Sequence, residues 1–401
     1  MPIQTTTATA RSTNDARPTM RPSALRPARP PVRPEIEAAQ RVVVKIGTRA
    51  LADAQGELRL DRLGGLVTAL ADLRDAGREV LVVSSGAVGL GRKLLGVPLD
   101  SDAPPVLHAC AAAGQGRLVG AWEQALSRHS LVCAQVLLTE EDFDHRRRCL
   151  ELRETFARLF DLGAVPLVNE NDVVAHGALS SMTTRRAVFT DNDRLAALLA
   201  AELEADLLVL LTDVDGVLDA DPRQAPDARR LPTLENVAEL LDRLDATPGS
   251  ALGRGGMRSK VEAARLAARA GAQAVVAHAD DLDLVTAGAD AGTWLPASTA
   301  PRARRRWIAW AAAARGTLLL DAGAVRALRE RGASLLPVGV TAVEGSFAAG
   351  DVVELRDPSG AVIGRGRLGF DAATVRAWCR GLAPDGEHNC LLRRDDVFLE
   401  R

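Results

Sequence analysis

Short apolar runs alternate with helical patterns along the first 300 residues, and this alternation restricts the possible folds more than any other feature. The runs have the length of strands and cover residues 42–46, 80–83, 131–138, 165–168, 207–211 and 274–277. Between the first two, leucines recur at helical spacing from Leu63 to Leu73, and Gly77 stands where a helix commonly ends. Strands that are apolar throughout are typical of a parallel sheet covered by helices on both faces. The sequence therefore predicts an α/β fold, an αβα sandwich around a mostly parallel sheet.

The alternation stops near an arginine run at residues 302–306, which predicts a second domain. Beyond it lie a helical pattern at 322–331 and two short strands, 351–355 and 361–364, joined by the turn Asp357-Pro-Ser-Gly360 that is typical of a hairpin. At the other end, prolines interleaved with arginines predict a disordered tail. The expected organisation is a Pro/Arg-rich tail (1–40), the α/β domain (41–300), a linker (301–315), a small, mainly β domain (316–385) and a C-terminal tail (386–401).

Composition excludes several classes of protein. A net charge of −2 argues against a dedicated nucleic-acid binder, so RNA is not an expected partner. The five cysteines lack C-x-x-C spacing, which fits free thiols in a reducing cytoplasm better than disulfides or zinc. The histidines show no metal-binding spacing either, so no metal ligands are assigned. No apolar run approaches the roughly 18 to 20 residues of a membrane span. We expect a cytoplasmic protein.

Two lysines flanked by glycines indicate a site for phosphate groups. Lys45 lies in Val42-Val-Val-Lys-Ile-Gly-Thr48, and Lys260 ends Gly253-Arg-Gly-Gly-Met-Arg-Ser-Lys260, directly before a helical pattern. Glycines let backbone N–H groups approach an anion, a helix N-terminus adds partial positive charge, and lysine supplies a mobile full charge. The two segments predict phosphoryl transfer without a Walker loop.

Two polar loops after predicted strands are candidates for binding the second substrate. The loop Ser84-Ser-Gly-Ala-Val-Gly-Leu-Gly91 is either an anion cradle, with Ser85 as a hydroxyl donor, or an ordinary turn. In Asn169-Glu-Asn-Asp172 a turn would explain only one or two of the polar side chains, and Asp172 is a candidate acceptor for an ammonium group. The carboxyl ends of parallel strands are where α/β proteins bind ligands, so we expect both loops at one rim.

Two more loops extend that rim toward a nucleotide. Thr190-Asp-Asn-Asp193 precedes a helical pattern, and helix capping explains one of these residues but not all three acid and amide groups. In Leu211-Thr-Asp-Val-Asp-Gly216, Thr212 and Asp213 could meet a nucleotide or its Mg²⁺, or form an Asp-Gly turn only. Singly these loops indicate little, whereas their convergence on one sheet edge would indicate an active site.

Taken in order, the motifs resemble those of the glutamate 5-kinase branch of the amino acid kinase family. The resemblance runs from Val42 to about Phe370, and its motifs are Val44-Lys-Ile-Gly-Thr48, Ser84-Ser-Gly-Ala87, Ala113-Gly-Gln-Gly-Arg-Leu118, Asn169-Glu-Asn-Asp172, Asp191-Asn-Asp193, Thr212-Asp-Val-Asp-Gly216, Ala220-Asp-Pro-Arg223 and Gly255-Gly-Met-Arg-Ser-Lys260. Residues 332–337 and 350–353 resemble the PUA domain that such proteins often carry. The chain departs from the pattern at Arg49, at Arg254 and in a longer loop at 173–190.

The resemblance implies ATP-dependent phosphorylation of the side-chain carboxylate of L-glutamate, with Mg²⁺, to give L-glutamyl 5-phosphate for proline synthesis. By motif position Ser85, Asp172 and Asn192 would hold glutamate. Lys45 and Lys260 would stabilise the transferring group, with Asp193 orienting both. The residues around ATP would be Lys45, Thr212, Asp213, Arg254, Gly255, Gly256, Met257, Arg258, Ser259 and Lys260. The family also implies inhibition by proline, a homo-oligomer and glutamyl phosphate reductase as a possible partner.

Two other functions stay open on the sequence. A kinase of the same superfamily could act on aspartate, an acetylated amino acid, carbamate or a nucleotide. The PUA-like domain could instead make this an RNA-associated protein, although that domain offers few aromatic side chains for stacking on bases.

Overall fold

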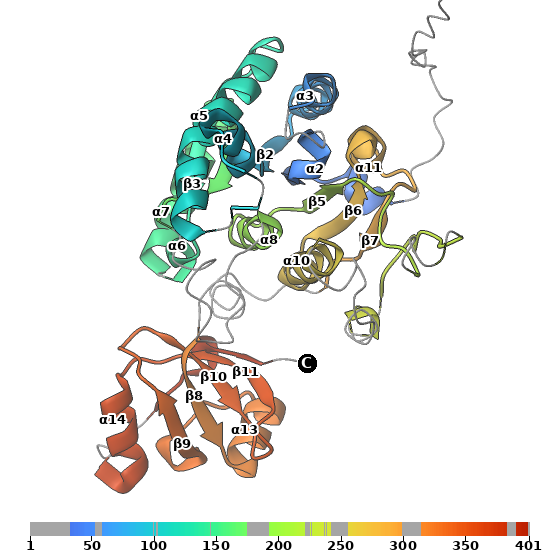
Figure 1. Cartoon of the computed structure of the whole chain (residues 1–401). Helices are drawn as coiled ribbons and strands as arrows, with labels where there is room; N and C mark the ends of the chain where they lie inside the picture. The colour runs from blue at the N-terminus through green and yellow to red at the C-terminus, as the bar shows by residue number, and fades with distance from the viewer. Residues whose placement is uncertain are drawn as a thin grey trace, which may run out of the picture. The chain divides into compact units, whose positions relative to one another are not determined.

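The computed structural model describes residues 33–52, 58–98, 100–101, 103–144, 146–174, 192–220, 225, 227–235, 237, 239–241, 256–298, 314–382 and 390–399. Figure 1 shows the chain with its elements labelled. Among the helices in these ranges, none is long and apolar enough to cross a membrane.

The larger domain is built on a seven-stranded sheet with the order β3-β4-β2-β1-β5-β6-β7. Its strands are β1 (Arg41–Ile46), β2 (Glu79–Ser84), β3 (Cys133–Leu138), β4 (Val165–Glu170), β5 (Leu207–Thr212), β6 (Gln273–His278) and β7 (Thr293–Leu295). The first six run parallel, and β7 pairs antiparallel with β6. The predicted α/β class with a mostly parallel sheet is confirmed. The three residues of β7 gave no periodic signal, so this edge strand was not predicted.

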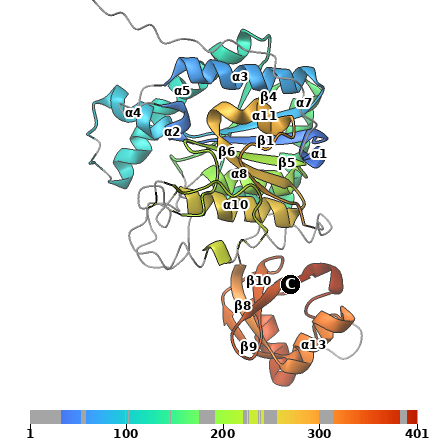
Figure 2. The same ribbon diagram turned by 90° about the vertical axis from the view of Figure 1, so that its right-hand side faces the viewer.

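Helices cover both faces of the sheet, as Figure 2 shows. On one face lie α3 (Leu60–Asp75), α5 (Pro104–Ser127), α11 (Leu282–Thr286) and the short α1 (Pro34–Glu37); on the other lie α7 (Arg146–Asp161), α8 (Asn192–Glu202) and α10 (Met257–Ala270). Successive side chains of a strand point to opposite faces. Val42 and Val44 accordingly pack with α3 and α5, whereas Val43 packs with α8. Lys45, two residues beyond Val43, therefore points to the α8 face.

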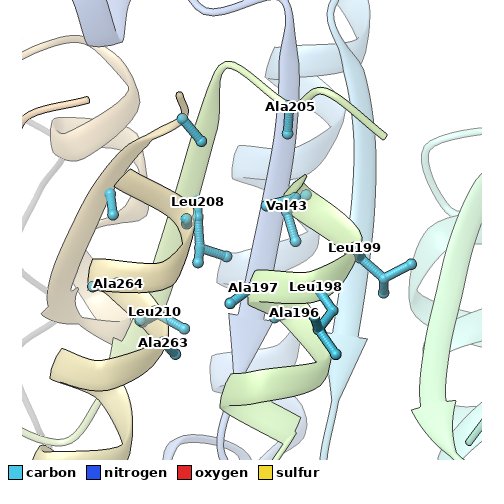
Figure 3. Packing of buried hydrophobic residues seen from close by; sticks show 14 of the residues in the cluster. Val43, Ala196, Ala197, Leu198, Leu199, Ala205, Leu208, Leu210, Ala263 and Ala264 are labelled. Carbon is cyan, nitrogen blue, oxygen red and sulfur yellow. The ribbon is translucent and has the colours of Figure 1, made fainter. Parts of the chain in front are cut away.

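Small side chains let α8 and α10 lie close to the sheet and to each other. Figure 3 shows Ala196 and Ala197 of α8 and Ala263 and Ala264 of α10 above the branched side chains of β1 and β5. All four alanines are almost fully buried. Because the first turns of these two helices carry Asp193 and Lys260, this packing sets where both side chains reach the edge of the sheet.

Glycines produce a second close contact, between α5 and α4 (Ala87–Leu95). A Cβ atom on Gly91 would lie 1.7 Å from the carbonyl oxygen of Cys110, and one on Gly114 would lie 1.8 Å from that of Ala87. No side chain fits at either position, because real Cβ contacts are never so short. Gly91 and Gly114 therefore serve helix packing, a use that neither interpretation of the loop 84–91, an anion cradle or an ordinary turn, predicted for Gly91.

The small domain is a five-stranded sheet with the order β12-β11-β10-β8-β9. Its elements are β8 (Ala314–Leu320), α13 (Ala322–Arg331), β9 (Val340–Gly345), β10 (Val352–Arg356), β11 (Val362–Arg367), α14 (Ala372–Ala377) and β12 (Val397–Leu399). β10 and β11 form the predicted antiparallel hairpin, in which Asp357 Oδ1 accepts a hydrogen bond from the Ser359 amide at 2.9 Å. The hairpin turn is therefore as the sequence indicated.

Three predicted boundaries are corrected by the structure. The folded chain includes Arg33 and α1, because Ile36 is fully buried and the guanidinium of Arg33 donates to the carbonyls of Ala291 (2.7 Å) and Pro232 (2.9 Å). β8 begins inside the expected linker 301–315, and β12 lies inside the expected tail 386–401 and pairs with β11. The prolines and arginines around Arg33 made this segment resemble a disordered tail, so its contacts were not predicted. β12 is too short to give a periodic signal. Residues 1–32 and 299–313 lie outside the described ranges.

The α4–α5 contact predicts opposite effects for two glycine substitutions on the same helix. Gly114→Ala forces a methyl group into the Ala87 carbonyl and should destabilise the fold by at least about 1–3 kcal/mol, the usual cost of overpacking. Gly120→Ala meets nothing within 4 Å, and alanine is the better helix former, so it should be neutral or stabilising by up to about 1 kcal/mol. Urea unfolding of both variants measures the difference. Equal stability of the two would show that α4 and α5 do not pack this closely.

Candidate active site

A buried carboxylate joins the two lysines that the sequence singled out. Asp193, in the first turn of α8, has 0% exposure. Its Oδ1 lies 2.7 Å from Lys45 Nζ, and its Oδ2 lies 3.1 Å from Lys260 Nζ. The three groups come from β1, α8 and α10, which are far apart in the chain, so the sheet edge brings them together as expected.

The backbone geometry at the start of α10 places Lys260 beside the Asp193 carboxylate. Gly256 precedes α10 with a φ of 95°, a conformation that favours glycine, and its carbonyl accepts the Lys260 amide at 3.2 Å. Ser259, in the same first turn, donates its hydroxyl to Asp193 Oδ2 at 3.2 Å. The helix therefore starts with both a lysine and a hydroxyl directed at Asp193, and its N-terminal amides lie beside them.

The choice of lysine at these two positions is unusual for this chain. Only Lys45, Lys93 and Lys260 are lysines among the 50 basic residues, and the rest are arginine. Two of the three are buried around one carboxylate. In their ordinary charge states the triad has a net charge of +1, and a compact ammonium places that charge nearer to a single point than a planar guanidinium does. Such a buried excess of positive charge attracts an anion.

Side-chain amides extend the site from Asn192, the neighbour of Asp193, toward α5. Asn192 Nδ2 donates to Ser85 Oγ at 2.9 Å and to Asn169 Oδ1 at 2.8 Å, and Asn169 Nδ2 donates to Gln115 Oε1 at 2.8 Å. Asn192 Oδ1 is buried and has no hydrogen-bond partner among the described residues. Ser85 and Asn192, both predicted for substrate binding, are thus in direct contact, whereas Asn169 and Gln115 were not on the predicted list.

Two carboxyl groups lie at the carboxyl end of β4. Burial raises the pKa of Asp172, an effect that His108 of α5 partly offsets. Burial, together with the neighbouring charges of Asp172 and Glu140, raises the pKa of Glu170 to about 8. Partly buried carboxyl groups close to one another are stabilised in their charged form by a cation. Glu170 was not among the predicted site residues, although an acid at the end of a buried strand was an available signal.

The predicted nucleotide residues lie at the ends of β5 and α10. Thr212 Oγ1 donates to Asp213 Oδ1 at 3.1 Å, and Asp213 is exposed. Met257 is half-buried, and Arg258 forms an ion pair with Glu262 at 2.9 Å. Arg254 and Gly255 fall outside the described residues, as does most of the loop 173–190. Within the described ranges no cluster of three or more His, Cys, Asp or Glu side chains could hold a metal ion.

The raised pKa of Glu170 predicts a pH-dependent stability. The folded chain holds this proton up to a pH of about 8, whereas an ordinary glutamate releases it near 4.5. The stability that Glu170 contributes is therefore fully present below pH 4.5 and is lost as the pH rises toward 8. Glu170→Gln does not titrate, so its Tm relative to the wild type should rise across this range. Exposed Glu154→Gln is the control. A Tm difference for Glu170→Gln that stays constant with pH would contradict this assignment.

Two sequence families match the chain. The model of the amino acid kinase family covers residues 40–278, and the model of the PUA domain covers residues 316–388. The first match contains the seven-stranded sheet up to β6 together with every group of the site described above. The second contains the small sheet except β12 and the first residues of β8.

Curated relatives match over most of the chain. The glutamate 5-kinase of Gluconobacter oxydans is 45% identical over 343 residues, which cover 84% of this chain and 88% of the relative. That of Halorhodospira halophila is 43% identical over 379 residues, 92% of this chain and 99% of the relative. Among solved structures, a carbamate kinase from Giardia lamblia bound to AMP-PNP is 18% identical and covers 65% of this chain and 100% of its own, with a TM-score of 0.48.

Proposed function

Because this chain belongs to the amino acid kinase family, in the glutamate 5-kinase branch that carries a PUA domain, we propose that it phosphorylates the side-chain carboxylate of L-glutamate with ATP. The product is L-glutamyl 5-phosphate, the first intermediate of proline biosynthesis. Relatives at 42–45% identity that align along nearly their whole length bear the name of this activity, which favours glutamate over the other acceptors of the superfamily.

The single observation that carries the proposal is the buried Lys45–Asp193–Lys260 triad. A carboxylate acceptor is already ionised at neutral pH, since the pKa of glutamate lies near 4.3, so the reaction needs no general base. Its difficulty is the repulsion between the carboxylate and the γ-phosphate. Two ammonium groups held by one carboxylate supply positive charge beside the transferring group and need no rearrangement during the reaction.

The residues at the nucleotide end fit ATP. The first turn of α10 directs its amides and Lys260 toward one point, which suits the phosphate chain, while Thr212 and Asp213 lie on the adjacent strand end. Mg²⁺ would neutralise charge on the phosphates. It usually keeps several water ligands and takes only one or two carboxylates, with Asp213 available here, so it requires no cluster of protein ligands.

The acceptor end fits the amino acid part of glutamate. We place the ammonium group near Asp172 and the unpartnered Asn192 Oδ1, and one carboxylate near the Ser85 hydroxyl. Burial of these groups means that a ligand must replace the water that they lose. Because Asn192 and Asp193 are consecutive, an amino acid held at Asn192 has its reacting end close to the lysines.

An acceptor panel tests the function directly. The purified chain is incubated with ATP, Mg²⁺ and hydroxylamine, which traps acyl phosphates as hydroxamates, and with glutamate, aspartate, N-acetylglutamate or carbamate in turn; ADP release from a nucleoside monophosphate is followed in parallel. We expect a product with glutamate at a kcat/KM at least about a hundredfold above that of the others, a ratio that corresponds to a difference of about 2.7 kcal/mol. A clear preference for any other acceptor would overturn the assignment.

The scarcity of lysine allows a clean test of the triad. Lys45→Met and Lys260→Met each remove one ammonium with little change in volume, and each should lower kcat on the order of a hundredfold or more, the scale for losing one charge-stabilising donor. Lys93→Met is the matched control, because Lys93 is exposed on α4. Circular dichroism and thermal unfolding separate lost chemistry from lost structure. Near-normal turnover by a folded Lys45→Met or Lys260→Met chain would remove that lysine from the mechanism.

Three further properties follow from family membership and are part of the proposal. We infer inhibition by proline, assembly into a homo-oligomer, and a reductase that consumes the labile acyl phosphate. A cytoplasmic location is proposed because none of the five cysteines, all of which lie in the described ranges, forms a disulfide. Adding proline to the acceptor panel and measuring mass in solution test the first two.

A further inference from the structure

We propose that Gln115 is a positioning residue for the acceptor substrate: it is the α5 end of an amide relay that presents Asn192 Oδ1 as a hydrogen-bond acceptor to the ammonium group. The relay is Gln115–Asn169–Asn192, with two hydrogen bonds of 2.8 Å. This inference rests on the proposed function, because it names the part of the amino acid that the relay would meet.

The polarity of the relay is set by one backbone group. The amide N–H of Glu170 can only donate, and it donates to Asn169 Oδ1 at 2.9 Å. The opposite atom of that side chain must then be the nitrogen, which needs an acceptor and finds Gln115 Oε1. The Asn192 atom that meets Asn169 Oδ1 must likewise be its nitrogen. Asn192 Oδ1 is therefore forced to the other side, where it is buried without a partner among the described residues.

An acceptor with no donor among the described residues calls for a donor on the ligand. Leaving such an oxygen unsatisfied is unfavourable, and a carboxylate placed against it would add repulsion. An ammonium group satisfies it, and in the proposed site the half-buried carboxyl of Asp172 would also face this ammonium group. The relay thereby selects an amino acid over the same acid without its amine.

Helix α5 is suited to hold the relay because it supports both substrate loops. Two turns after Gln115, Trp122 donates its indole N–H to Ser84 Oγ at 3.1 Å, and both residues have 0% exposure. Ser84 precedes Ser85, to which Asn192 also donates. Gly114, beside Gln115, packs against Ala87 of α4. Gln115 therefore acts on the carboxyl end of β4 from a helix that itself packs against the segment after β2.

Two substitutions at one position separate positioning from other roles. Gln115→Leu removes the acceptor and leaves Asn169 Nδ2 unsatisfied, so the KM for glutamate should rise roughly tenfold, the factor for about 1.4 kcal/mol, with the KM for ATP unchanged. Gln115→Glu keeps an acceptor oxygen and should restore most of the affinity. Gln124→Leu, the same change on the exposed face of α5, is the control.

Glutarate, which is glutamate without its amine, tests the specificity claim. The kcat/KM of Gln115→Leu should fall more for glutamate than for glutarate, so the preference of the wild type for glutamate should shrink several-fold. If Gln115 instead touched a substrate carboxylate through Nε2, Gln115→Glu would be worse than Gln115→Leu. That order, or an unchanged KM for glutamate in Gln115→Leu, overturns the proposal.

The outcomes also distinguish this inference from the proposed function. A wild-type chain that takes another amine-bearing acceptor refutes the glutamate assignment, and the variants are then compared on that acceptor. In that case the relay is supported if Gln115→Glu restores the KM for that acceptor that Gln115→Leu has raised. It is refuted if both variants raise this KM equally.

Discussion

The shared carboxylate of Asp193 is the interaction on which the site depends. Two ammonium groups buried at close range would repel each other and lose their hydration, a combination that a folded protein cannot hold without a counterion. Asp193 offsets both costs, with one oxygen for each lysine. Asp193 is itself completely buried, and its single negative charge offsets only one of the two ammonium groups in their ordinary charge states. The Lys45–Asp193–Lys260 group therefore suits an anionic ligand.

The position of that carboxylate follows from the packing of small residues. Alanines on α8 and α10 bring both helices close to β1 and β5, and this sets how far the first turns of the helices reach beyond the sheet. A larger side chain at Ala197 or Ala264 would lift a helix and with it Asp193 or Lys260. The chemistry of the site thus depends on contacts that contain no polar atom.

The first turn of α8 joins the two halves of the site. Successive helical residues point about 100° apart, so Asn192 and Asp193 face different partners from one turn. Asn192 connects through Asn169 to α5 and the acceptor end, and Asp193 connects β1 and α10 at the phosphate end. A small shift of this turn would move both halves together. In the proposed function, a single element would therefore align the two reactants.

Much of the fold could be predicted from local patterns in the sequence. All six apolar runs form strands within two residues of their expected ends, because strands buried on both faces are apolar without interruption. The convergence of Lys45, Asp193 and Lys260 followed from the rule that parallel strands present their carboxyl ends at one edge. The contacts of Arg33 were not predicted because it lies in a segment with the composition of a disordered tail. β12 was not predicted because a strand of three residues gives no periodic pattern.

The groups proposed to act on the substrates, and the side of the sheet on which they lie, could be predicted from the order of the residues, since both depend on periodicity and side-chain chemistry over a few positions. The roles of Gln115, Asn169, Gly91 and Gly114 were not, because each depends on which helix lies opposite and on the direction of a hydrogen bond from a distant backbone amide. Distances between remote segments and the orientation of amide groups arise only when the core has packed, so local patterns in the sequence could not predict them.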